Sequence, residues 1–97
     1  MSYTALFRGI AASEHLTFVR QALKELASAS LEEPGTIRYD FYQNQGNPTE
    51  FLLLGVWKSE IDWQAHLAGR AHSKYVASLP EGAWEVPPAQ TRLTPLE

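Results

Sequence analysis

The sequence predicts an α+β fold of the ferredoxin-like type, in which a four-stranded antiparallel sheet carries its helices on one face. Three features lead to this prediction: a helical pattern after the first strand-like segment, a turn between two further strands, and a second helical stretch before a final strand-like segment. The element order is therefore β-α-β-β-α-β. Because the 97 residues contain no internal repeat or low-complexity segment, we expect a single domain over residues 1–97.

The first strand and the first helix are predicted from residue type and spacing. Residues 3–10 are rich in β-forming side chains, which favours a strand. After Ser13, a candidate N-cap, apolar residues recur at helical spacings: Leu16, Val19, Leu23 and Leu26. We expect this helix to end near Ser30, because Pro34 disfavours helix in the residue before it and Gly35 permits a sharp reversal.

The second strand is predicted over residues 36–43, where the character of the side chains alternates. Its apolar side consists of Ile37, Tyr39 and Phe41, and its mixed side of Arg38, Asp40 and Tyr42. The composition of residues 44–48 is typical of a turn. We therefore expect a hairpin to the third strand, with a loop slightly longer than the two-residue minimum.

The third strand, residues 51–57, lacks the polar alternation of a strand that is buried on one face only. One of its faces carries Phe51, Leu53 and Trp57, and the other carries Leu52, Leu54 and Val56. Because the helices cover only one side of the sheet, the other set of side chains would form an apolar patch that marks an interaction surface. This pattern predicts a symmetric homodimer packed sheet to sheet.

The second helix is expected to follow the third strand directly, with Ser59 as its N-cap and Asp62 in its first turn. It should be interrupted near Gly69-Arg70, continue over residues 71–79 and stop at Pro80. Residues 84–86 and 91–94 are strand-like, but Pro87-Pro88 lies between them, which predicts an edge strand or a partly irregular end. We expect residues from about 90 to 97 to form an irregular or swapped tail.

Composition excludes several classes of partner and site. The formal charge is −3, with 8 basic and 11 acidic residues mixed along the chain, so no electrostatic footprint for nucleic acid or an anionic membrane is present. The chain has no cysteine, and no apolar run is long enough to span a bilayer. Its start lacks the basic and apolar regions of a signal peptide. A cytoplasmic protein is the expectation.

His66 and His72 are the candidate catalytic residues, because a neutral imidazole in an apolar cleft can act as a general base near pH 7. A purely structural role for both side chains is the alternative, and the residues alone leave it open. Six helical positions rotate the two side chains by about 240°, so they do not form the pair that a metal site uses. A kink at Gly69 could bring them together, but no third ligand has a matching spacing, so we expect no metal.

Four aromatic residues near these histidines could wall a cleft: Trp57, Trp63, Tyr75 and Tyr39. Rings at such spacings more often belong to a core than to a ligand site. A cleft lined by them would still suit a flat, weakly acidic aromatic ligand. The sequence has no phosphate-binding glycine loop, dinucleotide fingerprint or serine-centred elbow, so catalysis would depend on acid–base help and a shaped pocket.

Three short motifs occur in a characteristic order: Glu33-Pro34-Gly35-Thr36-Ile37-Arg38-Tyr39, Val56-Trp57-Lys58-Ser59, and Ala65-His66-Leu67 with His72 further on. Together they resemble the antibiotic biosynthesis monooxygenase family, a branch of the dimeric α/β-barrel proteins. The resemblance extends from Tyr3 to about Leu79. It implies a ferredoxin-like fold, a homodimer and a pocket between sheet and helices in each subunit.

The resemblance also implies a function, a cofactor-independent monooxygenase that acts with O2 on a small aromatic phenol or quinol or a polyketide-type substrate. His66 would be the base or hydrogen-bond partner and His72 its alternate, while Trp57, Tyr39, Tyr75 and Trp63 would wall the pocket. Haem-degrading relatives carry an Asn on the first strand, where this chain has Phe7-Arg8-Gly9. A stress-related or ligand-binding dimer without turnover and a small-molecule isomerase are the alternative functions.

Overall fold

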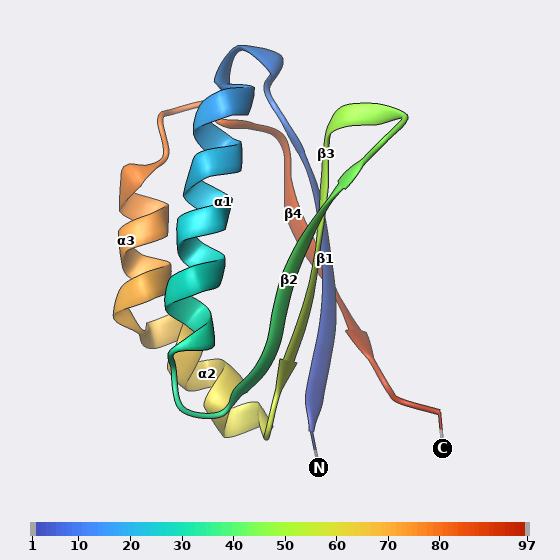
Figure 1. The fold of residues 1–97 in the computed structure, drawn as a ribbon, viewed down its shortest axis with the longest axis vertical. Coiled ribbons are helices and arrows are strands. Elements are labelled where there is room, and N and C mark those ends of the chain that lie inside the picture. The colour runs from blue at the N-terminus through green and yellow to red at the C-terminus, as the bar shows by residue number, and fades with distance from the viewer. Residues whose placement is uncertain (1, 97) are drawn as a thin grey trace.

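The structure, a computed structural model that describes residues 2–96, has the predicted order of strands and helices, with the second helical stretch divided in two (Figure 1). The elements are β1 (Tyr3–Ala11), a short 3-10 helix η1 (Ser13–His15), α1 (Leu16–Leu31), β2 (Thr36–Asn44), β3 (Asn47–Trp57), α2 (Glu60–Ala68), α3 (Arg70–Ser78) and β4 (Trp84–Leu93). The predicted ferredoxin-like fold is therefore confirmed. Among the described residues, no helix has both the length and the apolar character that a membrane crossing needs.

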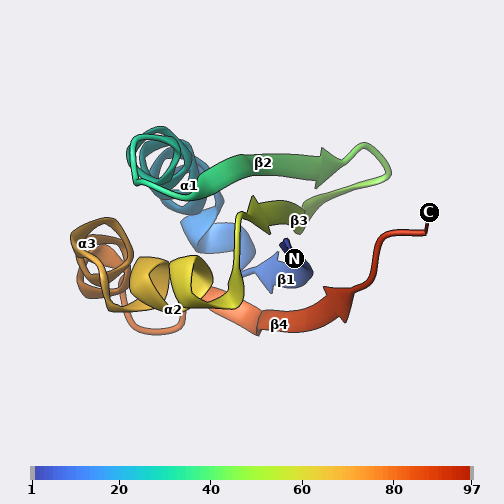
Figure 2. The same ribbon diagram turned by 90° about the horizontal axis from the view of Figure 1, so that it is seen from below.

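The sheet is antiparallel throughout and has the strand order β2-β3-β1-β4, so β3 and β1 are central and β2 and β4 are the edges. The helices all lie on one side of it (Figure 2). We call the side toward the helices the inner face and the opposite side the outer face. The two faces carry alternate residues of the same strands.

Strand β3 shows the contrast between the faces most clearly. On the inner face, Phe51, Leu53 and Trp57 retain only 6%, 6% and 1% of their exposed surface. Leu52, Leu54 and Val56, on the outer face, are half-buried. The predicted division of this strand into two apolar faces is confirmed.

Gly55 also belongs to the inner face, where the indole of Trp57 lies over it. A Cβ atom at Gly55 would stand 2.5 Å from Cη2 of Trp57, which is closer than real side-chain contacts allow. The absence of a side chain at Gly55 therefore lets the large Trp57 ring pack flat against its own strand.

The turn after α1 packs against the start of α2. Gly35 has a φ of 89°, a conformation that favours glycine, and a Cβ there would collide with the Asp62 side chain at 2.4 Å. The carbonyl of Gly35 accepts the backbone N–H of Lys58 at 2.8 Å. This junction holds the carboxyl end of α1 beside α2.

Helices α2 and α3 follow the predicted boundaries. The Ser59 hydroxyl accepts the backbone N–H of Asp62 at 3.2 Å and caps α2 as predicted. Gly69 is extended, with φ −82° and ψ 170°, and separates α2 from α3. The predicted interruption is confirmed, and α3 ends at Ser78, shortly before Pro80.

The prediction for Ile37 is wrong because β2 begins with a β-bulge. Thr36 pairs with Trp57 and Arg38 pairs with Val56, which leaves Ile37 as an extra residue in the ladder. The extra residue shifts the alternation, so Ile37 does not share the buried side of Tyr39 and is 50% exposed.

Two local predictions also need correction, one about a helix cap and one about a hairpin loop. Ser13 does not cap α1: it begins η1, Ala12 is the N-cap of η1, and no side-chain hydrogen bond caps either helix. The β2–β3 hairpin has the minimal two-residue loop, because Asn44 pairs with Asn47. The Asn44 side chain accepts the backbone N–H of Gly46 at 2.8 Å, which closes the turn tightly.

The C-terminal stretch is more regular than the predicted irregular or swapped tail. Residues 84–93 form β4, an edge strand as predicted, and its residues 90–93 pair with β1 between Thr4 and Phe7. Two residues, Pro87 and Pro88, lie opposite a single residue of β1, Gly9. This β-bulge accommodates the prolines without ending the strand. Residue 97, part of the predicted tail, lies outside the described residues.

Candidate functional site

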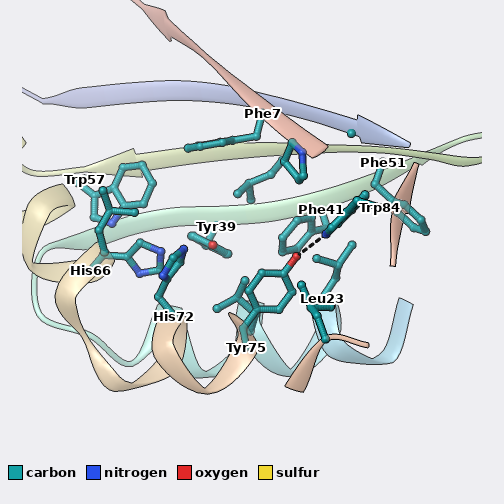
Figure 3. A pocket seen from close by; sticks show the side chains of 16 residues that line it. Phe7, Leu23, Tyr39, Phe41, Phe51, Trp57, His66, His72, Tyr75 and Trp84 are labelled. Carbon is teal, nitrogen blue, oxygen red and sulfur yellow. Dashed lines mark hydrogen bonds between the residues drawn. The ribbon is translucent and has the colours of Figure 1, made fainter. Parts of the chain in front are cut away.

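A cavity of about 300 Å³ lies between the inner face of the sheet and the helices (Figure 3). From the sheet it is lined by side chains that include Phe7, Tyr39, Phe41, Phe51, Leu53 and Trp57. From the helices it is lined by side chains that include Leu23, Leu26, His66, His72 and Tyr75. The cavity is of the size that small-molecule sites have in proteins, at the lower end of their range.

The structure brings five of the six predicted site residues to this cavity: His66, His72, Trp57, Tyr39 and Tyr75. Trp63 does not line it, so the prediction for Trp63 is wrong. Its ring stacks on Tyr3 with a centroid separation of 4.4 Å, and the Arg92 guanidinium also lies 4.4 Å from the Tyr3 ring centroid. Trp63 therefore holds α2 against the end of the sheet, and His66, one turn later, faces the cavity.

The His66 side chain is almost fully enclosed, with 3% of its surface exposed, and it is paired with Glu33. The His66 Nδ1 atom lies 2.7 Å from the Glu33 Oε1 atom. Because a carboxylate can only accept, Nδ1 carries the proton in this bond. In the neutral ring Nε2 is then unprotonated, which is the state of a general base.

Glu33 reaches His66 because two glycines leave room for the approach. The Gly35 turn sets the end of α1 beside α2, as described above. A Cβ atom at Gly69 would stand 2.9 Å from the Glu33 Oε2 atom. The break between α2 and α3 therefore makes space for the carboxylate as well as redirecting the helix.

The same break brings the two histidines together, with ring centroids 5.7 Å apart. A continuous helix would have pointed them in different directions. Burial lowers the pKa of His72, the nearby His66 acts in the same direction, and Glu33 opposes both. The neutral form of His72 is therefore favoured at pH 7, and the cavity contains a second imidazole beside His66.

Two tyrosines complete the polar groups of the cavity. Trp84 Nε1 donates a hydrogen bond to the Tyr75 hydroxyl at 3.1 Å. Tyr39 lies next to His66, with ring centroids 5.1 Å apart. Burial raises the pKa of both tyrosines, so each keeps its proton at neutral pH and can donate it.

Sequence reasoning missed Glu33 as a site residue, although Glu33 opens the first motif. Its role depends on a contact with a residue 33 positions away, which no local spacing reveals. Phe51 could have been found, because alternation along β3 places it on the same face as Leu53, whereas the position of Phe7 depends on its pairing with Leu53 in the sheet. Trp84 was assigned only to a strand.

The site contains groups for moving a proton and for binding rings, and none of its lining residues is Asp, Glu, Lys or Arg. In the described part of the chain, no group of three or more His, Cys, Asp or Glu side chains could hold a metal ion. The arrangement can therefore accept a proton at an imidazole from a weakly acidic, uncharged aromatic molecule.

Comparison with known proteins gives a match over residues 3–78 to the model of the antibiotic biosynthesis monooxygenase family. A search of curated proteins found no match.

Several solved structures are similar over nearly their whole length. The protein Rv0793 from Mycobacterium tuberculosis is 23% identical, with a TM-score of 0.89 over 100% of this chain and 97% of that one. The protein PA3566 from Pseudomonas aeruginosa is 19% identical, with a TM-score of 0.91 over 99% of this chain and 95% of the other. A structure of an antibiotic biosynthesis monooxygenase is 16% identical, with a TM-score of 0.89 and 100% coverage of both chains. At these identities the likeness shows a shared fold.

Proposed function

We propose, since the chain belongs to the antibiotic biosynthesis monooxygenase family, that it is a cofactor-independent monooxygenase that oxidises a small aromatic phenol or quinol or a polyketide-type compound with O2. The observation that carries this proposal is the His66–Glu33 pair at an aromatic cavity without lining ions. This pair supplies the one group that an electron-rich, weakly acidic substrate needs from the protein, namely a base.

The first step in this proposal is proton transfer from a substrate hydroxyl to Nε2 of His66. Glu33 holds Nδ1–H and stabilises the imidazolium that forms, as a carboxylate does behind other catalytic histidines. The neutral His72 is close enough to assist as a second acceptor. The product of the step is an aromatic anion, which is a much stronger reductant than the neutral phenol.

The second step transfers an electron from that anion to O2, and the two radicals combine to form a carbon–oxygen bond. For a quinol, one oxygen atom enters the ring and the other leaves as water, giving a hydroxyquinone. For a ring CH2 group, the same balance gives a carbonyl and water. O2 receives all four of its electrons from the substrate, so the overall reaction needs no external reductant.

The apolar lining supports this chemistry by excluding water from the anion and from the peroxide that follows. It also holds the flat substrate against aromatic rings, which fixes the reacting carbon relative to His66. The cavity residues thus orient the substrate and exclude water, and none of them is Asp, Glu, Lys or Arg.

The experiment is oxygen uptake by the purified protein with anthrone-type and quinol-type compounds. The variant His66→Ala should lower kcat on the order of 10²–10⁴-fold, the usual contribution of a general base. The matched control is His15→Ala, since His15 lies in η1 and does not line the cavity. Turnover that is equal in wild type, His66→Ala and the double variant His66→Ala/His72→Ala would contradict the proposal.

The same assay separates the two other candidate functions. Saturable binding of these compounds, with unchanged compound recovered afterwards, would indicate a binding protein without turnover. Product formation under anaerobic conditions would indicate an isomerase. Either outcome would replace the monooxygenase proposal.

We also propose that the protein is a homodimer joined through the outer face of the sheet. The half-buried Leu52, Leu54 and Val56 support this, because no element of the described chain covers them (Figure 2). A second copy of the chain would cover the apolar surface of these three side chains that is still exposed, which is favourable in proportion to the area removed from water. Sedimentation velocity at several concentrations tests it, and a monomer throughout would contradict it.

A further inference from the structure

The three helices that cover the sheet differ in how firmly they are held. Helix α1 has several buried side chains, among them Val19, Leu23 and Leu26, and α2 has the buried His66. Helix α3 has no buried residue. Figure 2 shows α3 on the far side of α2 from the strands. It is thus the helix that is least embedded in the core.

Helix α3 nevertheless forms one wall of the cavity. His72 and Tyr75 line the cavity from α3, and Leu79 lines it directly after the helix (Figure 3). A second, smaller cavity of about 80 Å³ lies between α3 and α1, where Ala71 and Ala22 are among the lining residues. Because unfilled space lies on both sides of α3, its displacement would break few packing contacts.

The chain is anchored just before and just after this segment. Before it, the backbone N–H of Gly69 donates to the carbonyl of the enclosed His66 at 3.0 Å. After it, Ala83 is 3% exposed, and its carbonyl accepts the backbone N–H of Ala12 at 2.9 Å. Residues 70–82 are therefore a segment between two fixed points.

A glycine stands beside each anchor. Gly69 is extended between α2 and α3. Gly82 has a φ of 76°, and a Cβ atom there would meet no other atom within 4 Å. Hinges of moving segments are a few residues at the ends of elements that absorb the change in φ and ψ. Gly69 and Gly82 have the positions that such hinges require.

One hydrogen bond joins α3 to the sheet. It is the bond that Trp84 Nε1, at the start of β4, donates to the Tyr75 hydroxyl at 3.1 Å. The hydroxyls of Ser73 and Ser78 donate only to the carbonyls of Gly69 and Tyr75, at the ends of the same helix. Among residues 2–96, no other side-chain hydrogen bond or ion pair connects α3 with another element.

We propose that residues 70–82 form a lid that swings about Gly69 and Gly82 to open the cavity, and that the Trp84–Tyr75 hydrogen bond holds the lid closed. The structure has the closed position, with His72 beside His66. The inference goes beyond the proposed function, because it concerns access to the cavity rather than the reaction inside it.

The first measurement is amide hydrogen exchange of the full-length protein, followed by NMR without substrate. Amides of residues 74–78 should exchange about tenfold or more faster than the slowest amides of α1, through an opening that low concentrations of urea do not accelerate. Exchange of α3 and α1 through one common, urea-dependent opening would overturn the inference. Since no substrate or oxidation is involved, this outcome is separate from a failure of the monooxygenase proposal.

Two variants test the hydrogen bond that holds the lid. Tyr75→Phe removes the acceptor and Trp84→Phe removes the donor, so each should accelerate α3 exchange about two- to tenfold, as the loss of one hydrogen bond would give. The double variant should add little, because both changes break the same bond. The matched control is Trp63→Phe in α2, because the Trp63 indole N–H has no hydrogen-bond partner among the described residues. Unchanged α3 exchange in both single variants would overturn the inference.

A thiol inside the cavity tests whether the opening admits molecules. The native chain has no cysteine, and Leu23 lines the cavity from α1 with 3% of its surface exposed. The variant Leu23→Cys therefore carries a single enclosed thiol. Its reaction with iodoacetamide should become about two- to tenfold faster when Tyr75→Phe is added, in parallel with α3 exchange. An unchanged reaction rate alongside faster α3 exchange would contradict the lid, since the helix would then move without opening the cavity.

Discussion

The inner and outer faces of the sheet are made from alternate residues of the same strands, but they favour opposite states of ionisable groups. Between the inner face and helix α3, burial lowers the pKa of His72 and raises the pKa of Tyr75, so both α3 side chains favour the neutral form. On the outer face, hydrogen bonds from Asn44 and Arg8 lower the pKa of Glu50, so this carboxyl favours the charged form. The buried, neutral titratable groups therefore lie on the helix side of the sheet, where we propose that proton transfer takes place.

The faces also differ in what completes them. The inner face has its own helices, and the remaining space is the cavity. The outer face has apolar side chains around the Arg8–Glu50 ion pair and no covering element in the described chain. A single chain therefore builds its candidate site without help, whereas the outer face is the surface at which we propose that a second copy binds.

The largest expected effect comes from two adjacent leucines on opposite faces of β3. Leu53→Ala should destabilise the protein by about 2–5 kcal/mol, because Leu53 is buried in the core beside Phe7. Leu54→Ala should lower the stability by less in a dilute sample. Because Leu54 belongs to the outer face that we propose as the dimer interface, this variant should also change how the stability depends on protein concentration. Urea denaturation at two protein concentrations measures both. Equal costs that are independent of concentration would remove the distinction between the faces.

A smaller effect is expected from filling the space under Trp57. Gly55→Ala should destabilise by about 1–3 kcal/mol, since the new Cβ would displace the indole from the cavity wall. Gly46→Ala is the matched control, because its Cβ would meet only the Asn44 side chain at 3.5 Å, an ordinary contact. Thermal unfolding compares the two variants, and equal shifts in Tm would show that the Trp57 contact is not tight.

The Glu33–His66 pair should affect activity more than stability. Glu33→Gln removes the charge behind Nδ1 and should lower kcat about tenfold or more, while Glu33→Asp should retain part of the activity. NMR spectra of the protein with 15N-labelled histidine report the tautomer of His66 directly, and Glu33→Gln should reduce the Nδ1–H form. An unchanged tautomer would mean that Glu33 does not orient the ring.

A second variant tests the same pair without changing a titratable group. Gly69→Ala would place a Cβ 2.9 Å from Glu33 Oε2 and should shift the carboxylate from His66. The tautomer signal should then change in the same direction as in Glu33→Gln. If it does not, the Gly69 space is irrelevant to the pair.

The smallest expected effect is a difference in pH dependence between the faces. Below its ordinary pKa of 6.5, His72 binds a proton in the unfolded chain before it does so in the folded one, so stability should fall as pH drops through this window. The stability that Glu50 contributes should persist to lower pH and be lost below its ordinary pKa of 4.5, as the folded carboxyl is protonated. Urea denaturation of His72→Gln and Glu50→Gln across pH measures both, with each variant losing only its own window.

Much of the fold could be predicted because local patterns carry it. The uninterrupted apolar run of residues 51–57, the Ser59 cap and the Gly69 interruption each depend on neighbours in sequence, and the structure has all three features. The bulge at Ile37 could not be read from the pattern, since an extra residue in a ladder leaves the composition unchanged.

The candidate site was predicted only in part, because some of its residues depend on contacts between distant parts of the chain. The histidines and the aromatic residues were named from their nearness in sequence and from the family resemblance, and five of the six line the cavity. Trp63 was misplaced because its partner Tyr3 lies 60 positions away. Glu33 was missed because its contact with His66 requires the Gly35 turn and the Gly69 gap together.

The proline pair in β4 has a consequence for how the protein behaves at high concentration. Pro87 and Pro88 lack backbone N–H groups, so an incoming strand that aligned with this margin of the sheet would find donors missing. The proline pair therefore disfavours the addition of further strands at the β4 edge, which is how amyloid fibrils grow. At high protein concentration we therefore expect oligomers of defined size rather than fibrils.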